Sequence, residues 1–160
     1  MVGIEEFKQV LGSFPSGVTI TACYDQYGHV QGMTASAFCS VSLEPTLVLM
    51  CPSKKADCHN ALVAADSFSI NILKQEQTEL AWRFASKNTD KVNNLDIKKS
   101  PGGAPIFEGC LAFIECRQFA CYDGGDHSIL VGQVEYCEPP KDGDNPLVYC
   151  FGKLGGLNSV

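Results

Sequence analysis

Large apolar residues recur at every second position in short segments of the chain, which is the period of a β-strand. Residues 67–73 alternate between small polar and apolar side chains up to Ile72, and residues 18–24 alternate in a similar way. Residues 46–51 are continuously apolar, as expected of a strand that is covered on both faces. These patterns predict three strands.

The remaining elements follow from the same kind of pattern. Strands are predicted at residues 29–33, 111–122, 128–136 and 147–151, and a turn at residues 26–28. Helices are predicted at residues 2–11, 57–65 and 75–84, and a long polar loop at residues 86–103. We expect a single domain over residues 1–160, mainly β with a few helices. Its mostly antiparallel strands would close into a barrel, which removes exposed strand edges.

Composition and charge narrow the class of protein. Of the 160 residues, 45% are apolar and 19% are charged, which is typical of a globular protein. The net charge of −6 argues against nucleic acid as a partner. No apolar run approaches the roughly 20 residues needed to span a bilayer, and no signal-peptide pattern opens the chain. The expected location is the cytoplasm, away from membranes.

Nine cysteines are many for a chain of this length, and no pair has the C-x-x-C spacing of zinc or redox sites. Several lie inside apolar strand-like runs, for example Cys23, Cys51 and Cys116. Buried free cysteine behaves as a small apolar residue. We therefore expect structural thiols and no metal site.

Residues 32–38, Gly-Met-Thr-Ala-Ser-Ala-Phe, form a run of small and hydroxyl-bearing residues between two strand-like segments, and residues 40–45 extend it. Small side chains let a flat ligand approach the backbone, and Thr34 and Ser36 offer hydroxyls to a polar ligand edge. Ordinary turns use the same residue types. The segment alone leaves both interpretations open.

Three other segments carry candidate binding groups. Residues 51–57 join an apolar strand to a helix start, where Lys54 and Lys55 add positive charge suited to a phosphate. Phe84 follows Arg83 at a predicted helix end, and His127 opens a strand after two glycines. Each also has an ordinary interpretation, as solvated lysines, a core phenylalanine or a solvated turn histidine.

The chain lacks the sequence motifs of self-sufficient catalytic sites. It contains no H-E-x-x-H motif, no Walker loop and no G-x-G-x-x-G after a first strand. If the chain is an enzyme, we expect a bound organic cofactor to carry the chemistry while the protein supplies position and electrostatics.

Six segments, taken together and in order, resemble the flavin reductase-like family. They are FPSGVT (14–19), GMTASAF (32–38), SVSLEP (40–45), FSINIL (68–73), RFAS (83–86) and GDH (125–127). The resemblance implies the FMN-binding split-barrel fold and a homodimer with flavin near the subunit interface. It also implies hydride transfer from NADH or NADPH to N5 of FMN, or of FAD, in a reductase that supplies a separate monooxygenase.

The same resemblance assigns residues by position. It implies that the flavin ring and ribityl chain lie against Thr34, Ala35, Ser36 and Ala37. It implies further flavin contacts at Cys51, Pro52, Lys55, Ala56, Asp57, Phe84 and Ala85. His127 is the candidate catalytic residue and would contact the flavin and the nicotinamide, with Tyr149, Gly152 and Lys153 on the nicotinamide side.

The chain departs from the family pattern near the phosphate. An arginine pair is replaced by Lys54 and Lys55, and two hydroxyl residues are replaced by Ala56 and Cys58. We therefore expect the phosphate to be held by the two lysines and backbone N–H groups. Residues 151–156 also match loosely, which leaves the electron donor open.

Three functions fit these features. The first is an NAD(P)H:flavin oxidoreductase. The second is an electron carrier that holds FMN tightly and passes electrons to a redox-protein partner. The third is a non-catalytic split-barrel protein that binds haem or another nucleotide. The sequence leaves open FMN against FAD, NADH against NADPH and the final electron acceptor.

Overall fold

The computed structural model describes residues 2–87 and 90–157. Its helices are α1 (Ile4–Gly12), α2 (His59–Ala64), α3 (Thr78–Ala85) and the short 3-10 helix η1 (Gln75–Gln77). Its strands are β1 (Ser16–Gly17), β2 (Thr19–Tyr24), β3 (Val30–Ala35), β4 (Phe38–Leu43), β5 (Thr46–Met50), β6 (Ser67–Ile72), β7 (Ile97–Lys99), β8 (Pro105–Phe107), β9 (Ala112–Gly124), β10 (His127–Glu138), β11 (Val148–Cys150) and β12 (Lys153–Gly155).

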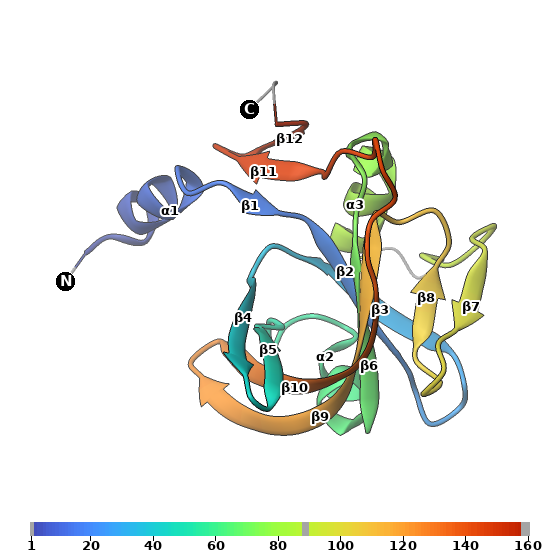
Figure 1. Cartoon of the computed structure of the whole chain (residues 1–160). Coiled ribbons are helices and arrows are strands. Elements are labelled where there is room, and N and C mark those ends of the chain that lie inside the picture. The colour runs from blue at the N-terminus through green and yellow to red at the C-terminus, as the bar shows by residue number, and fades with distance from the viewer. Residues whose placement is uncertain (1, 88–89, 158–160) are drawn as a thin grey trace.

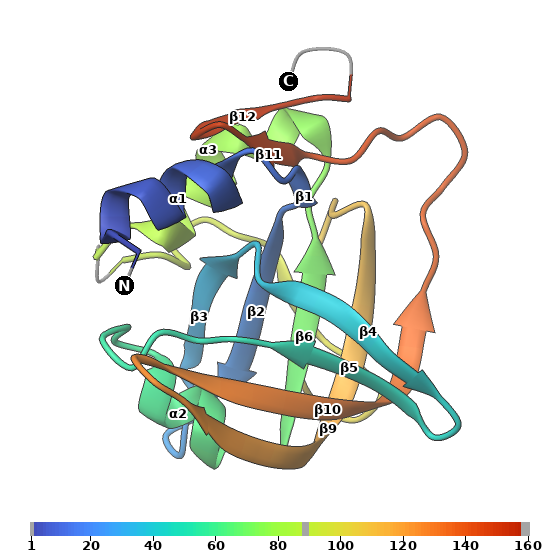
Figure 2. The ribbon, with the colours of Figure 1, turned by 90° about the vertical axis from the view of Figure 1, so that its left-hand side faces the viewer.

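Seven strands form one antiparallel sheet in the order β3-β2-β6-β9-β10-β5-β4. The first half of β9 pairs with β6, while the middle of β10 pairs with β5. Because β9 and β10 are long and bent, the sheet folds over itself, and β4 and β5 cross β2, β3 and β6 (Figure 2). This mainly β, antiparallel architecture confirms the expected fold class and is consistent with the split barrel.

Two apolar cores lie on opposite faces of β2 and β6. The first core joins the two halves of the folded sheet, with Phe68 and Ile70 of β6 packed among Met50, Leu130 and Leu62. The second core includes Ile20, Ala22, Leu73, Ala81, Phe84 and Phe107 and lies under α3 and β8. The alternation predicted for residues 18–24 therefore holds, but both faces of the strand are covered.

The polar face of β6 is buried, contrary to the simplest interpretation of its alternation. The Asn71 amide donates to the Ile20 carbonyl at 3.2 Å, and its carbonyl accepts from the Phe107 backbone N–H at 3.0 Å. The Ser69 hydroxyl donates to the Pro105 carbonyl. These bonds hold β8 against the sheet. The prediction of a structureless loop over residues 86–103 was wrong at its end, because β7 pairs with β8 there.

The first helix contributes nothing to these cores. Among its residues none is buried, and Ile4, Phe7, Val10 and Leu11 are all at least half exposed. Figure 1 shows α1 projecting from the body of the molecule. Its end is tied to the C-terminal hairpin, since the Phe151 backbone N–H donates to the Gly12 carbonyl at 2.7 Å.

Several predicted boundaries were wrong. The segment at residues 32–45 is mostly strand, and only Ser36 and Ala37 connect β3 to β4. Its hydroxyl residues concealed β4, which lies at the sheet edge. The helix predicted from Asp57 begins at His59 and spans six residues, and no side chain caps it. Helix 75–84 divides into η1 and α3.

All nine cysteines are free thiols. Burial raises the pKa of Cys23 and of Cys116 to about 12, and that of Cys110 to about 11. No group of three or more histidine, cysteine or acidic residues that could hold a metal occurs in the described residues. In the same part of the chain, each helix is too short or too polar to span a membrane.

Candidate functional site

Two adjoining cavities form a groove between β3, α3 and the loops beside them. The Trp82 compartment has a volume of about 190 Å³ and is lined by Val18, Thr34, Ser36, Ala81, Trp82, Ala85, Tyr149 and Leu154. The Lys55 compartment has about 280 Å³ and is lined by Met33, Thr34, Ser53, Lys55, Ala56, Asp57, Cys58, Phe84, Ala85, Ser86, Lys87 and Lys91. Thr34 and Ala85 line both cavities and mark where they meet.

The wall between β3 and α3 is fixed by close backbone contacts. The Thr34 hydroxyl donates to the Ala81 carbonyl at 2.6 Å, so it holds the helix against the strand. At Gly32 a Cβ atom would lie 3.3 Å from the Phe84 ring and 3.0 Å from the Thr21 carbonyl oxygen. Position 32 therefore favours glycine, and the close approach it permits keeps the groove narrow.

The Trp82 compartment is largely apolar, and three of its lining residues carry hydroxyl groups, Thr34, Ser36 and Tyr149. Tyr149 and Leu154 face it as a cross-strand pair of β11 and β12. Trp82 of α3 lines the compartment and is 55% exposed. This end of the groove suits a flat, largely uncharged ring with polar groups on one edge.

The Lys55 compartment gathers positive charge. Lys55, Lys87 and Lys91 line it, and Asp57 is the acidic residue among them. Lys91 is half-buried, and its ammonium donates to the Phe84 carbonyl at 3.3 Å. Burial raises the pKa of Cys58, and the nearby charge of Lys91 opposes that rise. This end of the groove suits an anionic group such as a phosphate.

Lys54 does not face the groove, which corrects the expectation that it anchors a phosphate. Its ammonium pairs with the Asp123 carboxylate and donates to the Gly125 carbonyl at 2.7 Å. Its backbone N–H donates to the Asp126 carbonyl at 3.0 Å. These contacts tie residues 53–54 to the tip of the β9–β10 hairpin. Lys55 is thus the phosphate candidate of the pair.

His127 lies next to the groove rather than in its wall. It forms an isolated antiparallel bridge with Ser53, which lines the Lys55 compartment. Its Nδ1 lies 2.8 Å from the Asp126 carboxylate, and its side chain is 43% exposed. That hydrogen bond holds the pKa of Asp126 below its ordinary value. The other edge of the ring remains available to solvent or to a ligand.

Seven predicted residues line the groove: Thr34, Ser36, Lys55, Ala56, Asp57, Ala85 and Tyr149. Phe84 touches it with a side chain that is otherwise core and packs edge-to-face on Phe107 with ring centroids 5.0 Å apart. The remaining predicted residues lie outside both compartments: Ala35, Ala37, Cys51, Pro52, His127, Gly152 and Lys153.

The residues outside the groove have clear structural places. Ala35 is buried in the first core, so its side chain cannot face a ligand. Ala37 and Cys51 lie side by side, with the Cys51 backbone N–H donating to the Ala37 carbonyl at 3.2 Å. Gly152 and Lys153 lie at the exposed turn of the β11–β12 hairpin. The strand pair presents Leu154 to the groove instead.

Sequence reasoning missed Trp82, Leu154, Lys87 and Lys91. Trp82 is the single tryptophan of the chain and lies on the polar side of a predicted helix, which was a usable signal. The two lysines carried no signal, because their place depends on how the loop after α3 folds back. The Arg83 guanidinium sets that fold by donating to the Asp90 and Asn93 carbonyls at 3.0 and 2.5 Å.

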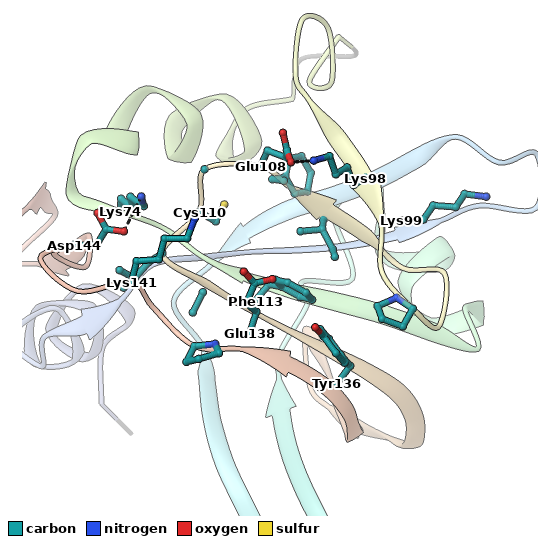
Figure 3. Close-up of a pocket in the computed structure, with 17 residues that line it drawn as sticks. Lys74, Lys98, Lys99, Glu108, Cys110, Phe113, Tyr136, Glu138, Lys141 and Asp144 are labelled. Carbon is teal, nitrogen blue, oxygen red and sulfur yellow. Dashed lines mark ion pairs between the residues drawn. The ribbon is translucent and has the colours of Figure 1, made fainter.

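A separate cavity of about 450 Å³ lies between β7, β8, the start of β9 and the end of β10 (Figure 3). It is larger than either compartment, but none of the predicted site residues lines it. Its charges largely pair with one another, Lys74 with Asp144 at 2.8 Å and Lys98 with Glu108. We therefore assign the functional site to the groove.

Known flavin reductases are similar to this chain. The model of the flavin reductase like domain matches residues 11–158. Reductase subunit HsaB of a flavin-dependent monooxygenase from Mycobacterium tuberculosis is 39% identical over 153 residues, covering 94% of this chain and 81% of its own. FMN reductase (NADH) SmoA from Agrobacterium fabrum is 40% identical over 149 residues, covering 93% and 83%.

Two solved structures of similar proteins have the same fold as this chain. Nitrilotriacetate monooxygenase component B from Mycobacterium thermoresistibile superposes with a TM-score of 0.90 at 35% identity, covering 96% of this chain and 86% of its own. The NADH:FAD oxidoreductase SgcE6 of Streptomyces globisporus, solved with NAD and FAD fragments, gives a TM-score of 0.87 at 32% identity, covering 96% and 94%.

Proposed function

The chain belongs to the flavin reductase-like family, and from this premise we propose that it uses NADH to reduce a flavin held in the groove. The observation that carries the proposal is the groove's division into an apolar end and a cationic end. A flavin nucleotide has the same division, with a flat ring at one end and phosphate at the other. When bound, the flavin supplies the chemistry by accepting a hydride at N5.

The residues present fit such a ligand. The Trp82 compartment would hold the ring, with Ser36 offering its hydroxyl to the polar edge, since the Thr34 hydroxyl is already donated to Ala81. The Lys55 compartment would hold the phosphate end by charge-assisted contacts. In hydride transfer between stacked rings the protein's task is proximity and alignment, so no acid or base is needed.

His127 is the candidate for placing the nicotinamide. Its bridge to Ser53 brings it beside the Lys55 compartment, and its ring is open on the side away from Asp126. Tyr149 lines the opposite end of the groove. Because the nicotinamide must stack on the flavin ring in the Trp82 compartment, we expect Tyr149 to contact the nicotinamide there and His127 to position it by holding the rest of the NADH molecule along the groove. Relatives whose names specify NADH support NADH as the donor.

A second copy of the chain is the proposed cover for α1. The helix exposes Ile4, Phe7 and Val10 to a degree that is uncommon for a monomer. A homodimer would bury this apolar face, as the family resemblance implies. Light scattering should give twice the chain mass of 17.3 kDa. Phe7→Glu should give a monomer, whereas a monomeric parent at micromolar concentration would contradict the dimer.

The product would be reduced flavin delivered to a monooxygenase component, as in the relatives that are named reductase subunits. The nine free thiols fit a reducing compartment, so we propose the cytoplasm as the site of action.

Flavin-dependent oxidation of NADH tests the function. Purified protein should oxidise NADH only when FMN or FAD is present. Ser36→Ala should weaken flavin binding, and His127→Ala should raise the KM for NADH while leaving flavin affinity unchanged. Absence of NADH and NADPH oxidation with either flavin would overturn the reductase assignment. Unchanged kinetics in His127→Ala would remove that residue from the site.

A further inference from the structure

The separate cavity of about 450 Å³ shown in Figure 3 is a second candidate binding site. Its volume falls within the range of small-molecule sites, roughly 300–1,000 Å³. Among the described residues, none that lines this cavity also lines the Trp82 or the Lys55 compartment. A ligand bound here would leave the flavin groove free, so its binding does not depend on the proposed function.

The irregular walls of the cavity are fixed by the chain's own polar contacts. The Glu115 carboxylate, which is 1% exposed, accepts from the Gly102 backbone N–H at 2.9 Å. This bond fixes the turn between β7 and β8, which carries the lining residue Pro101. The segment that follows β10 is fixed by the ion pair of Lys74 with Asp144 at 2.8 Å. The cavity is therefore preformed, as ligand sites usually are.

One side of the cavity is an aromatic surface. Phe113 of β9 and Tyr136 of β10 both line it, and their rings stack with centroids 5.6 Å apart at an interplanar angle of 29°. The Phe113 side chain is buried, whereas Tyr136 is 41% exposed. Ile106 and Leu111 add aliphatic surface to the same cavity. These side chains suit an apolar or aromatic group of a ligand.

Within the described part of the chain, two charged side chains of this cavity have no ion-pair partner. Lys74 and Lys98 are neutralised by carboxylates, and the Lys99 ammonium lies over an aromatic ring, 5.1 Å from its centroid. Lys141 and Glu138 also line the cavity, but neither forms an ion pair within residues 2–87 and 90–157. The cavity thus offers one ammonium and one carboxylate that can pair with a ligand.

These two charges select a ligand that carries both signs. Figure 3 shows Lys141 extending on the Cys110 side of the cavity and the Glu138 carboxylate on the Phe113 side. Glu138 repels a ligand that has only a carboxylate, and Lys141 repels one that has only an amine. A ligand with both groups can pair each with its opposite charge and still place an apolar group against the aromatic surface.

From this arrangement we propose that the cavity binds a small zwitterion of the amino-acid class with an aromatic side chain. Lys141 pairs with the ligand carboxylate, Glu138 pairs with its ammonium group, and the Phe113 and Tyr136 rings contact its side chain. Both charged residues are exposed to solvent, so each ion pair contributes modestly. The expected dissociation constant is therefore on the order of 1 mM.

Titration of the isotope-labelled protein with L-phenylalanine, followed by NMR, tests the proposal. The backbone N–H signals of Phe113 and Tyr136 should shift and give the dissociation constant. Phenethylamine lacks the carboxylate and 3-phenylpropionate lacks the ammonium group, so each should bind about fivefold more weakly than L-phenylalanine. Glycine keeps both charges but has no ring, and it should bind about tenfold more weakly.

Two variants that remove one charge each locate the ligand. Glu138→Gln should weaken L-phenylalanine binding about fivefold and strengthen 3-phenylpropionate binding, because the repulsion of its carboxylate is gone. Lys141→Gln should weaken L-phenylalanine binding to the same extent and strengthen phenethylamine binding. Misfolding cannot give these opposite responses. Glu6→Gln and Lys8→Gln, on the exposed helix α1, are the matched controls and should change none of the affinities.

Unchanged signals of Phe113 and Tyr136 at about 20 mM L-phenylalanine, well above the expected dissociation constant, would overturn the proposal. Equal binding of 3-phenylpropionate and L-phenylalanine would also overturn it, because the cavity would then be a site for anions. Displacement of L-phenylalanine by FMN would place the ligand in the groove and overturn it as well. Failure of flavin to bind, measured separately, would contradict only the proposed function.

Discussion

The Trp82 compartment and the Lys55 compartment adjoin, yet they are built from different parts of the fold. The first rests on β3, α3 and the β11–β12 pair, whose positions follow from sheet register and helix packing. The second is made largely of two loop segments, residues 53–58 and 85–91, held by side-chain contacts such as those of Lys54 and Arg83.

The two compartments are therefore fixed by different kinds of contact. Regular elements fix the Trp82 compartment, because Thr34 and Gly32 lock α3 to β3. The positive charge of the Lys55 compartment depends on which lysines the two loop segments direct toward the groove. The Lys54 ammonium is already paired with Asp123 at the tip of the β9–β10 hairpin, whereas Lys55 and Lys91 face the groove. Neighbouring lysines in the sequence thus have unrelated tasks.

The largest effect should come from closing the groove where its compartments meet. Ala85 lines both cavities at the exposed end of α3, and leucine is well tolerated in helices. Ala85→Leu should weaken binding of riboflavin, FMN and FAD alike by about 100-fold, or about 2.8 kcal/mol. Isothermal titration calorimetry measures the dissociation constants of the three flavins.

Ala64→Leu is the matched control, because Ala64 is an exposed residue of α2 outside the Trp82 and Lys55 compartments. It should leave flavin affinity unchanged. If Ala85→Leu bound riboflavin as well as the parent does, the ring would not occupy the Trp82 compartment.

A smaller effect should distinguish the two neighbouring lysines. Lys55→Ala should weaken FMN binding about fivefold at low salt, since an exposed ammonium contributes about 1 kcal/mol to an ion pair. Riboflavin has no phosphate and should bind equally well. Lys54→Ala should change FMN affinity less, because that ammonium is already paired with Asp123. A larger loss in Lys54→Ala than in Lys55→Ala would reverse the assignment.

The smallest effect should come from the ion pair between Lys54 and Asp123 at the tip of the β9–β10 hairpin. Hydrogen bonding to Lys54 holds the pKa of Asp123 below its ordinary value of 3.8. A carboxylate with a lowered pKa stabilises the fold above that ordinary value and loses the contribution as the pH falls through the folded-state pKa. Asp123→Asn should therefore melt slightly below the parent at pH 7, and the gap should shrink as the pH falls below 3.8 and vanish once it is below the folded-state pKa. A gap that persists in acid would exclude the ion pair as its cause.

Much of the fold was predictable, because apolar alternation marks β2 and β6, a continuous apolar run marks β5, and long strand-like segments mark β9 and β10. These five strands form the centre of the sheet. The sequence failed where burial does not follow hydropathy. Ser40 and Ser42 concealed β4, an edge strand with exposed residues. β8 has three residues and is held by the polar Ser69 and Asn71, so no periodic signal marks it.

The residues that line the groove divide in the same way. Thr34, Ser36 and Ala85 were predictable because their segments resemble a family and lie on or beside regular elements. Lys87 and Lys91 were not, since their place in the groove depends on a loop that Arg83 clamps through backbone carbonyls. Such contacts leave no pattern in the sequence.

Anaerobic reduction of bound flavin tests the central claim most directly. We predict that NADH, added to the protein with FAD or FMN in the absence of oxygen, bleaches the visible absorption band of the flavin. The rate should fall in His127→Ala, while the fraction of flavin bound beforehand stays the same. Flavin that binds but remains oxidised with both NADH and NADPH would contradict the reductase and leave an electron carrier in its place.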